Sequence, residues 1–238
     1  MESLDDLLIP RTPTAKRPLL GLTVLVVEDS RFACEAVRLL CLRSGARIRR
    51  ADSLEHAQKH LGVYRPNVLI VDVGLPDGSG LDLIKSSATG TPRIDVVLGT
   101  SGEPQCEADV MGAGADGFIA KPIGSLSLFQ SAILSHLPAD RRPSGPRAVT
   151  NDSVAPDMIA YHDDLSHVVQ VIESDDSGQS VGYITQFLGG IAKSVADDDL
   201  NRAAAEIAYD HARGVDTAAA VVALNRLVHS RLNAVGPL

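Results

Sequence analysis

One segment constrains the fold of this chain more than any other: residues 68–80, which read VLIVDVGLPDGSG. Its first half is an apolar run rich in β-branched residues, and Asp72 is the only charge in that run. A short apolar run that ends in a cluster of Gly, Pro and Asp is typical of a central parallel strand covered on both faces. Because open α/β sheets carry their chemistry beyond the carboxyl ends of the strands, we expect Asp72 at the rim of a crevice.

The neighbouring sequence repeats this alternation of strands and helices. Segments with the composition of strands lie at residues 23–27, 46–50, 68–73, 94–98 and 117–120. Helical periodicity separates them, with Ser30 and Ser53 as expected N-caps and Gly45 as an expected helix end. The pattern predicts a flavodoxin-like, doubly wound parallel sheet of five strands, with the fourth strand ending before Gly99.

Composition divides the chain into four parts. Residues 1–20 are punctuated by proline and are expected to form an N-terminal arm. Residues 21–138 hold the α/β pattern, and the proline-rich residues 139–156 have the composition of an extended linker. Over residues 157–238 the β-branched runs disappear and helical periodicity takes over. The sequence therefore predicts an α/β domain followed by an all-α helical bundle.

Two apolar seams indicate how the helices of the second half pack. Apolar residues recur at steps of three and four over residues 158–172 and 181–195, and further helices are expected at 198–212 and 216–232. Two such helices from each of two chains would complete a four-helix core. The helical half is therefore a candidate for homodimerisation or for contact with another protein.

The charge of the second half argues against a nucleic-acid partner. Residues 151–238 contain five Lys and Arg residues against thirteen Asp and Glu residues, a net charge of −8 that equals the charge of the whole chain. Such a domain repels phosphate backbones, and no basic recognition helix is visible. Aromatic residues make up 3% of the chain and Trp is absent, which argues against a stacking surface for single strands.

Cysteines and hydropathy indicate the compartment. Cys34, Cys41 and Cys106 lack the spacing of a metal site, and the first two are expected to be buried, reduced thiols. No apolar run approaches the roughly 18 residues that a membrane span needs. The first residues also lack the apolar core of a signal peptide. We expect a cytoplasmic protein without a membrane partner.

Acidic residues occur at the ends of two predicted strands. Glu28 and Asp29 follow the first strand, and Asp72 ends the third. Because the carboxyl ends of parallel strands meet at one edge of the sheet, we expect the three carboxylates to lie close together. Like charges at short distance repel one another unless a cation joins them. Mg²⁺ prefers oxygen ligands and accepts a phosphoryl oxygen, so the sequence predicts a magnesium site here.

A basic group and a hydroxyl complete the same rim. Lys121 follows the fifth predicted strand, and Thr100 and Ser101 follow the fourth. Transfer of a phosphoryl group to a carboxylate needs a nucleophilic Asp, a metal ion, and an ammonium and a hydroxyl for the remaining phosphoryl oxygens. The predicted site holds all of these groups.

Together these motifs resemble the receiver domain of response regulators in two-component signalling. The resemblance spans residues 22–138 and rests on VVEDS, VDVGLPDGSG, LGTSG and the pair Lys121-Pro122. It implies that Asp72 is the phospho-acceptor and that a histidine kinase or histidine phosphotransfer protein is the donor. It also implies a phospho-accepting signalling protein and not an enzyme, with at most autophosphorylation from small donors and autodephosphorylation.

The resemblance also implies roles for the surrounding residues. Asp29 would bind Mg²⁺ directly together with Asp72, Glu28 would bind it through water, and the backbone carbonyl of Gly74 would be a further ligand. Lys121 would pair with the phosphoryl group, and its bond to the following proline would be cis. The Glu-Asp pair replaces the more usual Asp-Asp pair and is still compatible with metal binding.

A switch is implied as well. The hydroxyl that contacts the phosphoryl group is either Thr100 or Ser101, and Thr100 is preferred because a small residue follows it. When this hydroxyl moves, Phe118 is expected to turn inward and to reshape the face made by the fourth helix, the fifth strand and the fifth helix.

Two histidines of the second half leave an alternative open. His162 precedes two aspartates and so resembles the start of a histidine-kinase dimerisation helix, whereas His211 resembles a histidine-phosphotransfer motif. The spacing also places His162 on or beside the apolar seam, where a core histidine is the simpler interpretation. The expected function is a response regulator with a helical interaction or dimerisation domain, and the alternative is a phosphorelay protein.

Overall fold

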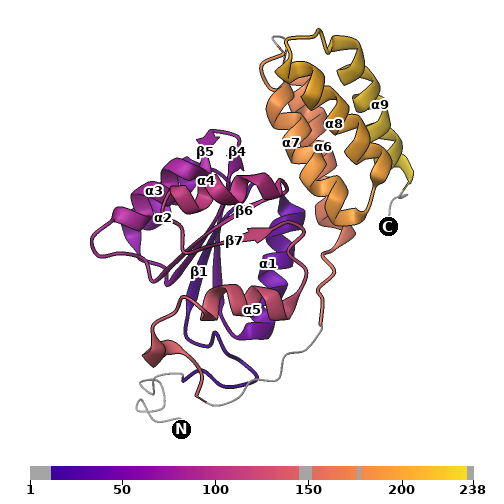
Figure 1. Ribbon diagram of the computed structural model, residues 1–238. Coiled ribbons are helices and arrows are strands. Elements are labelled where there is room, and N and C mark those ends of the chain that lie inside the picture. The colour runs from indigo at the N-terminus through magenta and orange to yellow at the C-terminus, as the bar shows by residue number, and fades with distance from the viewer. Residues whose placement is uncertain (1–11, 145–151, 176–177, 235–238) are drawn as a thin grey trace.

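The computed structural model describes residues 12–144, 152–175 and 178–234. Figure 1 shows an α/β domain built around a sheet and a bundle of long helices that stands against one end of it. The predicted fold classes, a flavodoxin-like α/β domain and an all-helical C-terminal region, are confirmed.

The sheet of the α/β domain is parallel and doubly wound. Its strands are β1 (Thr23–Val27), β2 (Arg47–Ala51), β3 (Val68–Asp72), β6 (Val96–Ser101) and β7 (Gly117–Ala120). Within the described ranges these five strands pair in the order β2-β1-β3-β6-β7. This order reverses between β1 and β3, and open sheets of this kind place their sites at that reversal.

A small antiparallel ladder that the sequence analysis did not predict follows β3. It consists of β4 (Gly74–Leu75) and β5 (Gly78–Ser79). The amide of Gly80 then donates a hydrogen bond of 2.9 Å to the carbonyl oxygen of Val73. The ladder therefore returns the chain directly to the end of β3, where the next helix begins.

Helices cover both faces of the sheet. They are α1 (Arg31–Ser44), α2 (Leu54–Val63), α3 (Gly80–Thr89), α4 (Glu107–Gly112) and α5 (Leu126–Leu134). Successive residues of a strand point to opposite faces. Val24 and Val26 of β1 accordingly pack in the core with α1 and α5, whereas Leu25 and Val27 pack in the core with α2, α3 and α4. Two covered faces explain why the central strands are continuously apolar.

The fourth strand of the sheet differs from the prediction. It was expected over residues 94–98, but β6 extends through Ser101. Thr100 pairs with Asp72 of β3, and Ser101 pairs with Ala120 of β7. Ladder partners on both sides therefore continue the strand beyond the Gly99 signal.

The second half forms a bundle that is complete within one chain. Its helices are α6 (Met158–Ser174), α7 (Val181–Val195), α8 (Asp198–Ala212) and α9 (Ala218–Ala234). The seam residues Leu165, Ile184 and Leu188 are buried in the same core as Leu224 and Val228 of α9. Helices α8 and α9 thus complete the core that the sequence analysis assigned to a second chain, so the seams require no homodimer.

The segment before the bundle and helix α6 both contact the α/β domain. Before α6 the chain pairs with the start of α5: Val154 is buried in the α/β core and donates from its amide to the carbonyl oxygen of Gly124 at 2.9 Å. Farther on, α6 packs against α1 (Figure 1), where the rings of Phe32 and Tyr161 meet edge to face at 6.1 Å. Phe32 belongs to the bundle core although α1 belongs to the α/β domain.

Cys34 and Cys41 are free and buried, as predicted, and Cys106 is partly exposed. Among the helices of the described ranges, none combines the length and the apolar character that crossing a membrane requires.

Gly80 tests how tightly the start of α3 is packed under the site. A Cβ at Gly80 would lie 1.9 Å from the carbonyl oxygen of Asp72, which is backbone and cannot move aside cheaply. We expect Gly80→Ala to lower the free energy of unfolding by about 1–3 kcal/mol. Gly62→Ala in α2 is the control, because nothing lies within 4 Å of the added Cβ. Urea unfolding followed by circular dichroism measures both, and equal values for the two variants would contradict the packing described.

Candidate functional site

Three carboxylates meet at the carboxyl ends of β1 and β3, as predicted. One oxygen from each of Glu28, Asp29 and Asp72 lies within 4.8 Å of the others. Glu28 is 2% exposed and Asp72 is 6% exposed. Oxygen ligands gathered in this way fit a hard divalent cation.

Lys121 lies against the same carboxylates. Its Nζ atom lies 2.7 Å from Oε2 of Glu28 and 3.0 Å from Oδ2 of Asp72. The Lys121-Pro122 bond is cis, as the resemblance implied. The residue that follows β7 therefore brings the predicted ammonium group to the predicted place.

Burial perturbs the proton affinities of these groups. It raises the pKa of Glu28 to about 8, with Lys121 opposing the rise and Asp72 adding to it. Burial also raises the pKa of Asp29 to about 6, although a hydrogen bond from Tyr183 opposes this. Burial alone would lower the pKa of Lys121, but Asp72 and Glu28 raise it above its usual value. One cation thus faces three carboxylates, and their excess negative charge favours a second cation.

The two candidate hydroxyls point in different directions. The Thr100 hydroxyl donates to the backbone oxygen of Ile119 in β7 at 2.7 Å. Ser101 lines the space beside the carboxylates, and its hydroxyl accepts from the amide of Glu103 at 3.1 Å. Thr100 is the hydroxyl that the sequence favours, but Ser101 is the one of the two that lines this space.

We call the space that these groups enclose the acidic cavity. Its walls in the α/β domain include the three carboxylates together with Gly74, Ser101 and Lys121. Gly74 is the first residue of β4, two positions after Asp72. Phe118 is partly buried and packs with the core beneath α2, α3 and α4. The structure therefore brings together most of the predicted site and holds Phe118 in the neighbouring core.

Comparison with protein families identifies this arrangement. A family model described as the response regulator receiver domain matches residues 24–133. Residues 24–133 are a response regulator receiver domain. The match ends in α5, so the helical bundle lies outside it.

Curated relatives share the receiver domain. It is similar to the KDP operon transcriptional regulatory protein KdpE of Escherichia coli (strain K12), with 30% identity over 101 residues, 42% of this chain and 45% of KdpE. It is also similar to the virulence transcriptional regulatory protein PhoP of Shigella flexneri, with 32% identity over 100 residues and the same shares. The chain thus spans less than half the length of these relatives.

Solved structures resemble slightly less than half of the chain. One is a putative response regulator from Chloroflexus aurantiacus J-10-fl, with a TM-score of 0.44 and 28% identity over 48% of this chain and 98% of that chain. Another is the chemotaxis response regulator CheY4 of Vibrio cholerae, with a TM-score of 0.39 and 24% identity over 42% of this chain and 87% of that chain.

Helix α7 of the bundle lies across the acidic cavity of the receiver domain. The Tyr183 hydroxyl donates to Oδ2 of Asp29 at 2.7 Å. Ten residues later, Nζ of Lys193 donates to the backbone oxygen of Gly102 at 2.8 Å. Between these contacts, α7 adds Gln186, Phe187, Gly190 and Ile191 to the lining of the cavity. The cavity thus has walls from the receiver domain and a roof from the bundle.

Asp164 of α6 caps the first turn of α1 in the receiver domain. Its carboxylate accepts from the Ser30 hydroxyl at 2.7 Å, from the Arg31 amide at 2.8 Å and from the Phe32 amide at 3.0 Å. The first amides of a helix lack partners within the helix and attract negative charge. Asp164 is 2% exposed, so its buried charge depends on these three donors.

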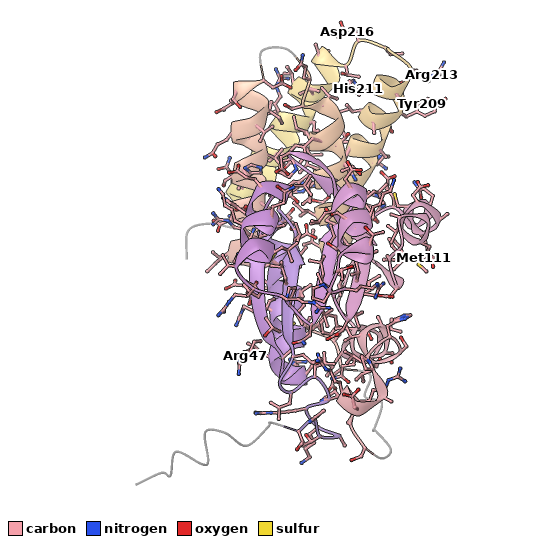
Figure 2. The ribbon with its side chains drawn as sticks, turned by 90° about the vertical axis from the view of Figure 1, so that its left-hand side faces the viewer. Arg47, Met111, Tyr209, His211, Arg213 and Asp216 are labelled. Carbon is pink, nitrogen blue, oxygen red and sulfur yellow. The ribbon has the colours of Figure 1, made fainter. Side chains whose placement is uncertain are left out.

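The two histidines of the bundle lie elsewhere. His162 is partly buried, and its Nε2 atom is buried without a hydrogen-bond partner among the described residues. His211 is exposed in the last turn of α8, near Tyr209 and Arg213 at the top of Figure 2. Among the described residues that line the acidic cavity, neither histidine occurs.

Sequence reasoning missed the residues that join the two parts. Tyr183, Gln186 and Lys193 were not predicted as functional residues, and Asp164 was considered only as a neighbour of His162, because the apolar seams dominate α6 and α7. A signal was present: residues 183, 186 and 193 follow one another at helical spacing beside the seam and form a second, polar stripe on α7. A polar stripe beside a core seam indicates a second packing surface.

Two neighbouring aspartates test the capping contact. Asp164→Ala removes three hydrogen bonds to a charged acceptor, so we expect it to weaken docking of the bundle by about 1.5–3 kcal/mol. Asp163→Ala is the control. It removes only the exposed ion pair with Arg31, whose side chains are 60% and 44% exposed, and exposed pairs contribute about 0–1 kcal/mol. Small-angle X-ray scattering should show a larger radius of gyration for Asp164→Ala alone. An unchanged radius in both variants would contradict the contact.

Proposed function

We propose that this chain is a two-component response regulator that accepts a phosphoryl group on Asp72 from a histidine kinase or histidine phosphotransfer protein and acts in the cytoplasm. One observation carries the proposal. Asp72 ends β3 within ion-pair distance of Lys121 and beside Glu28 and Asp29, inside a domain of the receiver family. No other group of carboxylates in the described residues offers a comparable metal site.

The neighbours of Asp72 fit defined roles in this chemistry. Asp29 and Asp72 would hold Mg²⁺ together with the Gly74 carbonyl, and Glu28 would hold it through water. The ion supplies positive charge for the phosphoryl oxygens. Lys121 and the Ser101 hydroxyl would contact the remaining phosphoryl oxygens. Ser101 takes the role of the hydroxyl because it faces the acidic cavity, whereas the Thr100 hydroxyl bonds to β7.

The output is proposed to act through protein contacts. The relatives are named as transcriptional regulators, but the similarity to them is confined to about 100 residues and the family match ends in α5. The bundle belongs to the half of the chain that carries the net charge of −8, which disfavours binding to phosphate backbones. Because α7 roofs the cavity, the bundle must move before a donor protein reaches Asp72. That movement would expose surfaces of both parts to partners.

Substitution of Asp72 tests the assignment of the acceptor. Asp72→Asn keeps the size of the side chain and removes the nucleophilic carboxylate, so we expect labelling by acetyl phosphate and Mg²⁺ to be abolished. Asp82→Asn in α3 is the control, since Asp82 is exposed and lies outside the acidic cavity. Intact-mass spectrometry measures the label. Persistent labelling of Asp72→Asn would overturn the assignment.

The perturbed carboxylates predict a pH dependence of Mg²⁺ binding. The ion binds ionised carboxylates, whereas the pKa of Glu28 is raised to about 8 and that of Asp29 to about 6. Below those values the protein holds protons that the ion must displace, so affinity should fall as the pH decreases. We expect Mg²⁺ to bind about tenfold or more tightly at pH 8 than at pH 6.

Isothermal titration calorimetry is the suitable measurement for Mg²⁺ binding, because the chain has no Trp whose fluorescence could report it. Titration in buffers of different ionisation enthalpy gives the number of protons released. Affinity that is independent of pH, with no proton release, would show that the carboxylates are already ionised in the metal-free protein.

A further inference from the structure

Helix α7 brings a carboxamide to the wall of the acidic cavity. A Cβ built on Gly74 would lie 2.2 Å from Nε2 and 2.7 Å from Oε1 of Gln186. Only a glycine therefore leaves room for this amide at a position two residues after Asp72. Within the described residues the Gln186 amide makes no hydrogen bond to the protein, so its donor and its acceptor remain available.

The backbone on either side of Gln186 is fixed by specific contacts. Tyr183, one turn earlier, donates to Asp29, and Lys193, two turns later, donates to the Gly102 carbonyl. Residues at these spacings lie on one face of a helix. That face of α7 is thus held against the receiver domain at both ends, with Gln186 between them.

The space beside Gln186 suits small molecules. The acidic cavity has a volume of about 30 Å³, which is room for roughly two water molecules. Gln186 itself is solvent-exposed and forms part of the rim, so water reaches the cavity alongside its amide. Asp72 lines the same cavity and is 6% exposed. In this arrangement the site admits water and excludes the side chain of a donor protein.

We propose that Gln186 is a catalytic residue of an intramolecular phosphatase: in the docked arrangement it positions the water that hydrolyses an aspartyl phosphate on Asp72. The proposal rests on the proposed function, because it needs Asp72 to be the phospho-acceptor. A glutamine that orients an attacking water is an established solution in phosphoryl transfer, where catalysis consists mainly of positioning and charge stabilisation. The bundle then ends the signal each time it returns to the receiver domain.

The reaction needs only water besides the phosphorylated chain. Oε1 of Gln186 accepts a hydrogen bond from the water, and Nε2 donates to a phosphoryl oxygen. The water oxygen forms a bond to phosphorus while the bond between phosphorus and the Asp72 carboxylate oxygen breaks. The water proton ends on the departing inorganic phosphate, and the Asp72 carboxylate returns with its negative charge beside Lys121.

A decay experiment on the full chain tests this proposal. The protein is labelled with acetyl phosphate and Mg²⁺, the donor is removed, and loss of the phosphoryl group is followed by intact-mass spectrometry. We expect Gln186→Ala to slow the loss by about 10- to 100-fold. Gln179→Ala is the matched control. Gln179 is an exposed glutamine just before α7, outside the acidic cavity, and its replacement should leave the rate unchanged.

Two further measurements separate chemistry from docking. Hydrolysis in ¹⁸O-labelled water should place the heavy oxygen in inorganic phosphate, as attack at phosphorus requires. Scattering should show that Gln186→Ala keeps the radius of gyration of the docked protein. The variant Asp164→Ala, which loosens docking, should also slow the decay although its Gln186 is intact.

The results distinguish the possible failures. If no variant and no wild-type protein takes up label, the proposed function fails. If wild type is labelled and Gln186→Ala decays at the same rate or faster, the bundle is only a cover and the phosphatase proposal is overturned. The proposal would also be overturned if Gln186→Ala decays more slowly but shows an increased radius of gyration, as expected for Asp164→Ala. Loss of docking would then explain the slower decay.

Discussion

The ammonium of Lys121 between Glu28 and Asp72 is the interaction on which the site depends. Parallel strands bring three carboxylates to one edge, and burial deprives them of the water that would screen their repulsion. The ammonium of Lys121 lies 2.7 Å from Glu28 and 3.0 Å from Asp72 and compensates part of their charge. Burial is the main cause of the raised pKa values of Glu28 and Asp29, and the charge of Asp72 adds to it. Under the proposed function, a divalent metal ion would compensate the remaining negative charge and would hold the phosphoryl group beside Asp72.

The contact between the bundle and the receiver domain must also overcome repulsion between negative charges. The bundle belongs to the acidic half of the chain, yet it docks beside an acidic cavity. Hydrogen-bond donors make this possible. The Ser30 hydroxyl and the first amides of α1 donate to the carboxylate of Asp164, and the Tyr183 hydroxyl donates to Asp29. Helix ends and hydroxyls thus permit an approach that net charge alone would oppose. The docking contacts and the acidic cavity therefore overlap at Asp29 and Ser30.

The sheet and the acidic cluster could be predicted from the sequence alone. Strands and the residues at their ends are recognisable locally, and parallel strands bring their carboxyl ends to one edge of the sheet. Glu28, Asp29, Asp72 and Lys121 were placed in this way. The choice between Thr100 and Ser101 was not accessible, since it depends on one residue of ladder pairing at the end of β6. Contacts such as Ser30 with Asp164 span more than 130 residues. Periodicity shows which helix face is apolar, but it does not show which surface that face will meet.

The short connection before α6 limits how far an undocked bundle can move. Val154 is held in the core beside α5, so only residues 155–157 separate this anchor from the first residue of α6. Three residues extend over about 10 Å at most. A released bundle therefore stays near its docking surface at an effective concentration in the millimolar range or above. The ratio of docked to undocked molecules is then independent of protein concentration. A separate donor protein at micromolar concentration must compete with the tethered bundle for access to the acidic cavity.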